Sequence, residues 1–148
     1  CIRDRCTTQA SVTIDQKLYS EIGKGFLVLI GICDEDTKET ADKMVRKLIG
    51  MRIFSDENGK TNLALKDVDG QLLLVSQFTL YADCKKGNRP SFVKAGSPQH
   101  ANELYEYIID ACKKEVPVVK TGVFGAEMEV ALINDGPFTI ILDSKDLA

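Results

Sequence analysis

Three polar residues lie inside a run of apolar residues that is otherwise suited to burial. Residues 71–81 read QLLLVSQFTLY, and Ser76, Gln77 and Thr79 interrupt the run near its end. A buried polar group without a hydrogen-bond partner costs about 1–3 kcal/mol. These side chains therefore either satisfy a neighbouring strand or line a pocket, and the pattern leaves both interpretations open. On a strand, Gln77 and Thr79 would share one face, and Ser76 and Phe78 the other.

A second unusual stretch lies near the end of the chain, where residues 134–142 read NDGPFTIIL. Asn-Asp-Gly between two apolar runs is typical of a hairpin turn. Here Gly136 is followed directly by Pro137, which has no N–H to donate to a strand ladder. Two interpretations remain open. The segment is a turn between two strands, or it is a rigid main-chain element that presents carbonyl groups to a ligand.

The residue types that build most side-chain catalytic sites and metal sites are missing from this sequence. His100 is the only histidine, and there is no Gly-x-Ser-x-Gly motif, phosphate-binding glycine loop or Cys-x-x-Cys pair. We expect no catalytic triad, no metal and no cofactor. The cysteines are expected to be free thiols in a reducing compartment. They are Cys1, Cys6, Cys33, Cys84 and Cys112.

Composition indicates a soluble globular protein with a locally basic segment. Hydrophobic residues make up 44% of the chain and charged residues 28%, and no run approaches the roughly 20 apolar residues of a membrane span. The net charge of −3 argues against a general nucleic-acid coat, so any nucleic acid must be held locally. The candidate for such a contact is residues 85–94, KKGNRPSFVK, for which a solvated loop is the alternative interpretation.

Periodicity predicts the elements that position these residues. We expect strands at residues 10–14, 18–22, 26–32, 51–55, 71–81, 125–133 and 138–142, with a hairpin between the first two. One amphipathic helix follows a capping box at Asp36 and Glu39 and ends at Gly50, and a second begins at Ser97-Pro98. This order predicts an α+β fold, with a mostly antiparallel, barrel-like β-sheet and two packing helices. Parallel β-α-β units are not expected.

The beginning of the chain differs from the rest. Residues 1–9, CIRDRCTTQ, have no initiator methionine, no apolar core of a signal peptide and no alternation of apolar and polar residues. We expect neither a signal peptide nor a strand in this segment. We interpret residues 1–9 as an atypical start, which is truncated, engineered or mis-assembled, of one domain that extends over residues 1–148.

Two long motifs resemble the D-aminoacyl-tRNA deacylase family, hydrolases that release D-amino acids from tRNA. They are residues 75–92, VSQFTLYADCKKGNRPSF, and residues 134–139, NDGPFT. The similarity follows the order of that family from Ala10 to Leu142. It implies a cytoplasmic hydrolase that does not associate with a membrane and that cleaves the ester of D-aminoacyl-tRNA at the tRNA 3′ end. It also implies chiral proofreading, glycyl-tRNA as a second substrate, and a homodimer with active sites at the subunit interface.

The resemblance also implies roles for individual residues. A cis Gly136-Pro137 bond enters the partner's pocket and rejects L-amino acids by collision, and Gly136 lets the carbonyl groups approach the substrate. Main-chain N–H groups of the Ser-Gln-x-Thr strand form an oxyanion site. The catalytic segment is thus Ser76, Gln77, Phe78 and Thr79, and the substrate-binding residues are Phe124, Met128, Asn134 and Thr139.

Thr79 has no evident base to activate its hydroxyl as a nucleophile. We therefore expect the 2′-hydroxyl of the terminal adenosine to assist the attack of water. The resemblance implies that Phe124 and Met128 occupy positions that contact the adenine. An aromatic ring such as that of Phe124 suits this role, because it can stack on an unpaired base. The alternative interpretation is that both are simple core residues.

One position departs from the family pattern. The family carries an arginine that helps hold the Gly-Pro segment, but alignment places Cys6 there and Arg5 one residue earlier. A shift of one residue on a strand reverses the face. A non-catalytic module that binds tRNA ends or DNA replication origins stays open as an alternative function. A general esterase is a weaker alternative because no nucleophile and base pair is visible.

Overall fold

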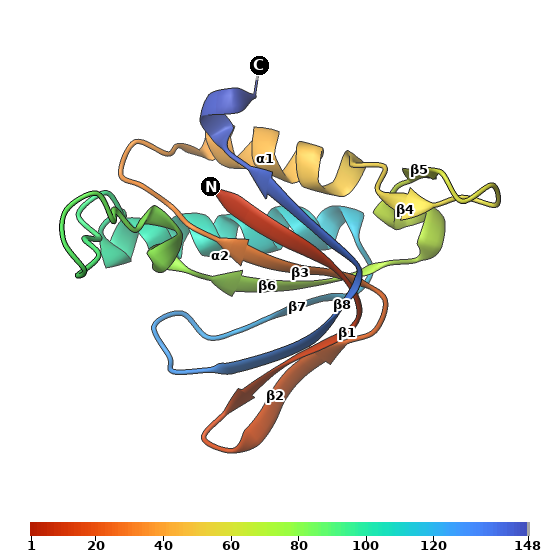
Figure 1. The fold of residues 1–148 in the computed structure, drawn as a ribbon, viewed down its shortest axis with the longest axis horizontal. Coiled ribbons are helices and arrows are strands. Elements are labelled where there is room, and N and C mark those ends of the chain that lie inside the picture. The colour runs from red at the N-terminus through yellow and green to blue at the C-terminus, as the bar shows by residue number, and fades with distance from the viewer. Residues whose placement is uncertain (148) are drawn as a thin grey trace.

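A mixed β-sheet, curled until it is nearly barrel-shaped, forms the centre of the protein (Figure 1). The computed structural model describes residues 1–147. In that range the strands of the large sheet are β1 (Ile2–Ile14), β2 (Lys17–Ile22), β3 (Gly25–Ile30), β6 (Gln71–Ser76), β7 (Val119–Thr121) and β8 (Glu129–Leu142). Their order is β2-β1-β3-β6-β7, and β8 pairs with β1. The first half of β1 pairs with β3 and its second half with β2, so β1 joins two sides of the curled sheet.

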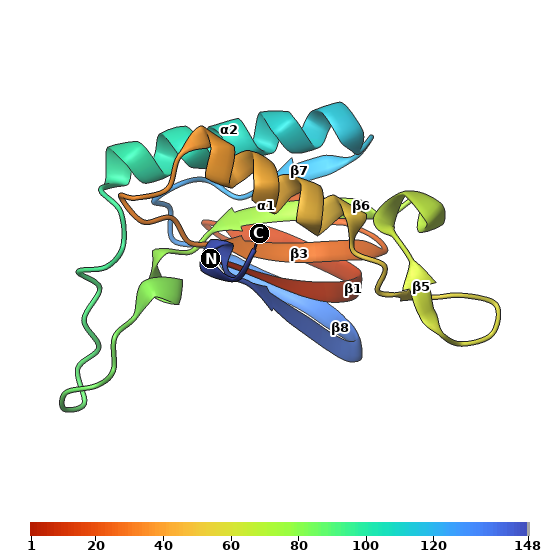
Figure 2. The ribbon, with the colours of Figure 1, turned by 90° about the horizontal axis from the view of Figure 1, so that it is seen from above.

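Two helices, α1 (Lys38–Gly50) and α2 (Pro98–Glu115), connect strands that run in the same direction (Figure 2). Strands β3 and β6 are parallel, as are β6 and β7, whereas β1 is antiparallel to β2, β3 and β8. The prediction that parallel β-α-β units are absent is therefore wrong. Strands buried on both faces are apolar along their whole length, which is typical of parallel strands. A separate small hairpin joins β4 (Phe54–Ser55) to β5 (Thr61–Leu63).

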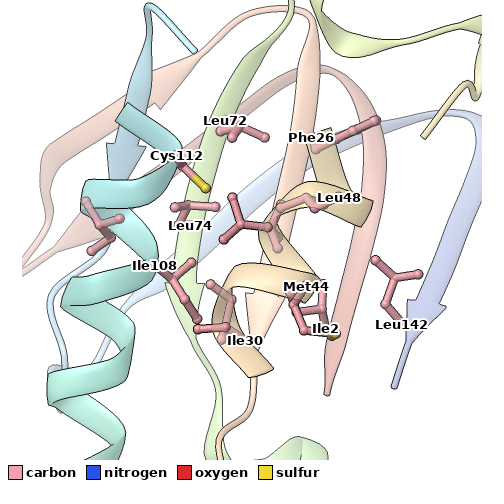
Figure 3. Close-up of a cluster of buried hydrophobic side chains, with 14 of the residues drawn as sticks. Ile2, Phe26, Ile30, Met44, Leu48, Leu72, Leu74, Ile108, Cys112 and Leu142 are labelled. Carbon is pink, nitrogen blue, oxygen red and sulfur yellow. The ribbon is translucent and has the colours of Figure 1, made fainter. Parts of the chain in front are cut away.

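Hydrophobic side chains pack on both faces of the sheet. On one face, Phe26, Leu72 and Leu74 of the strands pack with residues of the two helices (Figure 3). On the other face, Leu27, Leu73 and Val75 pack with residues from β1, β2 and β8. Successive residues of β3 and β6 thus enter different cores, which explains why these strands lack polar alternation.

Residues 2–9 are part of β1, so the prediction that residues 1–9 form no strand is wrong. Strand β1 begins at Ile2 and pairs with both β3 and β8 over this segment. The residues that face the helices are Ile2, Asp4 and Cys6, and all three are buried. Because the middle one is an acid, the alternation of apolar and polar residues is hidden in the sequence.

Several local predictions are confirmed, and one cap differs. Asp15 and Gln16 join β1 to β2 in the expected hairpin. Their φ values are 51° and 65°. Helix α2 has Ser97 as its N-cap, with Pro98 at its start. Helix α1 ends at Gly50 as predicted, but its capping box consists of Thr37 and Thr40 rather than Asp36 and Glu39. Within residues 1–147, no helix has the length and apolar character needed to cross a membrane.

Candidate active site

A groove of about 600 Å³ lies at the carboxyl ends of β3 and β6. Parallel neighbours end at the same edge of a sheet, where α/β proteins commonly bind ligands. Small residues hollow out part of the groove wall, among them Ala95, Gly96 and Ala126. The sequence held no signal for these small residues, because only the fold brings them to one place. The lining residues named in the sequence analysis are Ser76, Gln77, Phe78, Phe124 and Met128.

The chain turns sharply at the end of β6. The strand ends at Ser76, and the residues after Gln77 form a short 3₁₀ helix, Phe78–Tyr81. The prediction that Gln77 and Thr79 share a face of one continuous strand is therefore wrong. Their side chains still meet, because the Gln77 side-chain amide donates a hydrogen bond to the Thr79 hydroxyl across the turn. Of these residues, Thr79 does not line the groove.

Main-chain N–H groups at this turn differ in their availability. The N–H of Gln77 donates to the carbonyl oxygen of Ile30 at 2.7 Å and so continues the pairing of β6 with β3. The N–H groups of Phe78 and Thr79 lie in the first turn of the 3₁₀ helix, where no preceding helical carbonyl can accept them. Among the described residues, neither N–H has a main-chain acceptor, and of the two residues only Phe78 lines the groove.

Phe124 and Met128 line the groove from the segment between β7 and β8. Both side chains are half-buried, and Phe124 also packs against Tyr105 of α2 with ring centroids 6.2 Å apart. The hydroxyl of Tyr105 donates to the carbonyl oxygen of Leu74 at 2.7 Å, and burial raises the pKa of Tyr105, so this tyrosine stays neutral. The N–H of Val123 approaches the Met128 sulfur at 3.4 Å. The two residues therefore belong to the core and to the groove wall together.

Gly136 and Pro137 form an exposed bulge in β8 rather than a hairpin turn. The residues on both sides pair with β1 in one direction, as Asn134 lies opposite Thr7 and Thr139 opposite Arg5. The interpretation as a turn between two different strands is therefore wrong. The Gly136-Pro137 bond is cis, and Gly136 has a φ of 123°.

The side chain of Asn134 closes this bulge. Its oxygen accepts the N–H of Phe138 at 3.2 Å, and its NH₂ group donates to the Thr139 hydroxyl at 3.2 Å. Gly136, Pro137, Asn134 and Thr139 do not line the groove of their own chain. The structure thus gathers the predicted site residues into two separate places, the groove and the bulge.

Cys6 lies opposite this bulge, at the position where an arginine was expected from the sequence resemblance. Its side chain is buried, and burial followed by the nearby Asp135 carboxylate raises the pKa of its thiol. Arg5 points to the other face of β1, because neighbours on a strand alternate. The segment is held within its own strand by the hydrogen bonds of Asn134 to Phe138 and Thr139.

The basic segment, residues 85–94, which was left open as a nucleic-acid contact or a solvated loop, lies beside the groove. The main chains of Asp83 and Ser91 exchange hydrogen bonds of 2.7 and 2.9 Å, which close the base of the loop. Phe92 follows this base, lines the groove, and contacts Phe78 edge to face with ring centroids 5.2 Å apart.

The chain matches a known protein family over nearly its whole length. A family model described as D-Tyr-tRNA(Tyr) deacylase matches residues 4–143. The chain is 53% identical over 137 residues to a D-aminoacyl-tRNA deacylase of Clostridium novyi (strain NT), covering 93% of this chain and 92% of the relative. It is 51% identical over 137 residues to the D-aminoacyl-tRNA deacylase of Clostridium acetobutylicum, with the same coverage.

Two solved structures share the fold. One is named c-Myc DNA Unwinding Element Binding Protein, with a TM-score of 0.90, 39% identity, and coverage of 96% of this chain and 97% of that chain. The other is a probable eukaryotic D-amino acid tRNA deacylase, with a TM-score of 0.81 and 18% identity, covering 94% of this chain and 96% of that chain. The second likeness concerns the fold alone.

Proposed function

The chain belongs to the D-Tyr-tRNA(Tyr) deacylase family and is a hydrolase of the ester bond in D-aminoacyl-tRNA, and from this premise we propose where the substrate lies and how it is cleaved. The groove receives the terminal adenosine, and the ester lies at the turn after β6. One observation carries this proposal: the groove collects Ser76, Gln77 and Phe78 together with Phe124 and Met128. The chain acts in the cytoplasm as one functional domain and removes D-amino acids from tRNA before translation uses them.

The adenine stacks on the Phe124 ring, with Met128 at its side. Sequence-tolerant binding of an unpaired base rests on stacking against an aromatic face. Packing of Phe124 on Tyr105 holds the ring in place before the ligand arrives. The two earlier interpretations, core and adenine contact, are therefore compatible in this arrangement.

The ester carbonyl oxygen accepts hydrogen bonds from the main-chain N–H groups of Phe78 and Thr79. The N–H of Gln77 is already bonded to Ile30, so it contributes by fixing the turn. Such donors stabilise the negative charge that develops on the carbonyl oxygen in the transition state, and one donor is worth about 10²–10³ in rate.

Water attacks the carbonyl carbon with the help of the substrate's own 2′-hydroxyl. The water oxygen bonds to the carbonyl carbon, and the bond from this carbon to the ribose 3′-oxygen breaks. The 2′-hydroxyl takes the proton from water and passes one to the 3′-oxygen. The products are the D-amino acid and tRNA with an intact terminal ribose.

Gly136 and Pro137 reach the groove of a second subunit and exclude L-amino acids. Both residues are exposed, and Gly136 has no side chain to keep its main chain away from a ligand. The main chain of the segment then lies beside the α-carbon, where it binds the α-amino group of a D-residue and collides with the side chain of an L-residue. Glycine has no side chain to exclude, so glycyl-tRNA is a second substrate. Asn134 and Thr139 position this segment.

The surface around the bulge supports a homodimer. Strand β8 has 14 residues and pairs on one side with β1, while no described strand pairs with its other side. Long uncovered edges tend to associate. Ile133 and Ile141, on either side of the bulge, are 52% and 59% exposed. An apolar edge that carries Gly136 and Pro137 is well suited to receive a second copy of the chain.

Release of labelled amino acid from tRNA tests the proposed specificity. We expect D-Tyr to be released at least about a hundredfold faster than L-Tyr, because an L side chain meets the Gly136-Pro137 segment. Glycine should be released at a rate closer to that of D-Tyr. Equal rates for the D and L esters would contradict the rejection mechanism, and no release of glycine would contradict the proposed second substrate.

The variant Gly136→Ala tests the role of the bulge. Its Cβ would lie 3.1 Å from the Phe138 nitrogen and 3.2 Å from the Phe138 Cβ, at a φ of 123° that side chains rarely adopt. The segment must therefore shift, and a shift of about 1 Å at a reacting site can lower the rate about a hundredfold. We expect this loss in single-turnover deacylation, with a dimer still present in analytical ultracentrifugation.

Mixed dimers decide whether the bulge acts on the partner. Ala126→Phe would fill the groove, so this variant alone should be nearly inactive, as should Gly136→Ala alone. Random mixing with Gly136→Ala makes half of the dimers mixed, each with one intact site, so about a quarter of the wild-type activity should return. No recovery on mixing, or an active stable monomer, would show that the site does not cross subunits.

A non-catalytic binding module is the second candidate function. The relative of 39% identity is named as a DNA unwinding element binding protein. Binding of D-aminoacyl-tRNA without turnover at any enzyme concentration would favour the module. Cleavage of small aryl esters as fast as of D-Tyr-tRNA would instead favour a general esterase.

A further inference from the structure

The loop formed by residues 83–94 is basic, although the chain as a whole is acidic. It contains Lys85, Lys86, Arg89 and Lys94 but only one acidic residue, Asp83, while the net charge of the chain is −3. All four basic side chains are exposed. The remainder of the chain is therefore more acidic than the whole, and the loop is a local exception.

The single carboxylate of this loop is already engaged. Asp83 accepts the N–H of Lys85 at 3.0 Å and forms a salt bridge of 3.2 Å with Lys94. These contacts lower the pKa of Asp83, the Lys85 N–H being the largest cause, so it stays charged and paired with Lys94. In residues 1–147 this is the one salt bridge that the structure shows, so Lys85, Lys86 and Arg89 are left as unneutralised charges.

The loop is fixed to the mouth of the groove. Its base is closed by the paired main chains of Asp83 and Ser91, and the next residue, Phe92, forms part of the groove wall against Phe78. Figure 2 shows that the loop leaves the body of the fold beside the start of α2 and projects away from it. Arg89 is three residues from Phe92, which places its main chain within about 10 Å of the groove wall.

We propose that Lys85, Lys86 and Arg89 bind the phosphates of the single-stranded 3′ end of tRNA as it enters the groove. This inference rests on the proposed function, in which the groove holds only the terminal adenosine. The preceding nucleotides must then leave through the groove mouth, where the basic loop lies. An acidic protein needs such a local cluster, because phosphate contacts supply most of the sequence-independent affinity for nucleic acid. The guanidinium group of Arg89 can also bind phosphate with two parallel hydrogen bonds.

A triple variant and a charge-matched control test the inference. The test variant is Lys85→Gln, Lys86→Gln and Arg89→Gln, and the control is Lys113→Gln, Lys114→Gln and Lys120→Gln. The control removes the same charge from exposed residues at the far end of α2 and on β7. Lys113 and Lys114 follow Ala101, the last α2 residue in the groove wall, by roughly 18–20 Å along the helix.

Binding of deacylated tRNA is measured by fluorescence anisotropy over a range of salt concentrations. Each phosphate contact to a single strand contributes about 0.7 to the slope of log K against log salt, so the test variant should lose about 2 from that slope. Its Kd near physiological salt should rise on the order of tenfold to a hundredfold, while the control keeps the wild-type slope. The same slope in both variants would overturn the inference. So would loss of affinity for duplex DNA with unchanged affinity for tRNA.

A small substrate separates this inference from the proposed function. D-Tyrosyl-adenosine carries the ester and the adenosine but no phosphate, so the test variant should cleave it at the wild-type rate. A wild-type protein that leaves this ester and D-Tyr-tRNA intact contradicts the proposed function. A variant that cleaves the small ester normally and also binds tRNA normally contradicts only the role of the loop.

Discussion

A substrate whose terminal adenosine lacks the 2′-hydroxyl is expected to be deacylated about a thousandfold more slowly than normal D-Tyr-tRNA, since a positioned proton-transfer group typically contributes about 10²–10⁴ in rate. The Thr79 hydroxyl is not placed to carry the proton in place of the 2′-hydroxyl. The polar contact of its hydroxyl is the Gln77 amide, which donates to it and is not a base. The substrate hydroxyl is therefore the proton carrier in the proposed mechanism.

The variant Thr79→Ala is the counterpart of this substrate. It should keep single-turnover deacylation of normal D-Tyr-tRNA within about tenfold of wild type, because the main-chain N–H donors remain. Thr79→Ser, which retains the hydroxyl, serves as the matched control for packing. A deoxy substrate cleaved at the normal rate would refute substrate assistance. A folded Thr79→Ala enzyme without activity would assign the chemistry to the protein's own side chain.

Replacing Asp4 by valine is expected to stabilise the folded protein strongly at alkaline pH. Asp4 lies on β1 between Val28 of β3 and Ile140 of β8, with a relative exposure of 0%. Neither of its carboxylate oxygens has a hydrogen-bond partner. Burial raises the pKa of Asp4 from 3.8 to about 7, and the main-chain N–H of Ile140 is a smaller influence in the opposite direction.

The sign of the pH dependence follows from this shift. The folded protein holds the Asp4 proton more tightly than the unfolded chain, so stability is greatest below the unfolded pKa of 3.8 and falls as pH rises through about 7. Each pKa unit corresponds to about 1.4 kcal/mol, so the loss reaches on the order of 4 kcal/mol above pH 8. The variant Asp4→Val escapes this loss, since a valine needs neither a proton nor a partner in the core.

Denaturant unfolding at several pH values and one fixed protein concentration measures the difference. The free energy of unfolding of wild type minus that of Asp4→Val should become more negative between pH 5 and pH 8. Asp4→Asn is the control, because it removes the charge but keeps a buried polar group. It should lose the same pH dependence while remaining less stable than the valine variant. A difference between wild type and Asp4→Val that does not change with pH would contradict the assigned pKa.

Much of the local structure could be predicted from the sequence because it depends on neighbouring residues. The apolar face of α1, the cap at Ser97 and the hairpin at Asp15 and Gln16 each rest on interactions within a few residues. The motifs at residues 75–92 and 134–139 likewise indicated the family that the comparisons establish. These features follow from short-range geometry and from residue order alone.

Other features depended on contacts between distant parts of the chain. Residues 1–9 lack alternation because Asp4 occupies a core position, and only pairing with β3 and β8 makes them a strand. The apolar runs of β3 and β6 are compatible with either parallel or antiparallel pairing. Only the structure shows that the helices between the strands reverse the chain, so that β3, β6 and β7 run parallel. The polar residues after β6 suggested a strand face, but the turn into a 3₁₀ helix gave Gln77 and Thr79 a different arrangement.

The candidate site shows the same division. The sequence by itself determined which residues belong to it, since the motifs name the segment around Gln77 and the pair Gly136 and Pro137. Only the tertiary structure decided that these residues form a groove and a separate bulge within one chain. The physical reason is that a groove is made by small residues and strand ends brought together by packing. The position of a bulge is likewise set by its register on a neighbouring strand, and neither can be read from residue types along the chain.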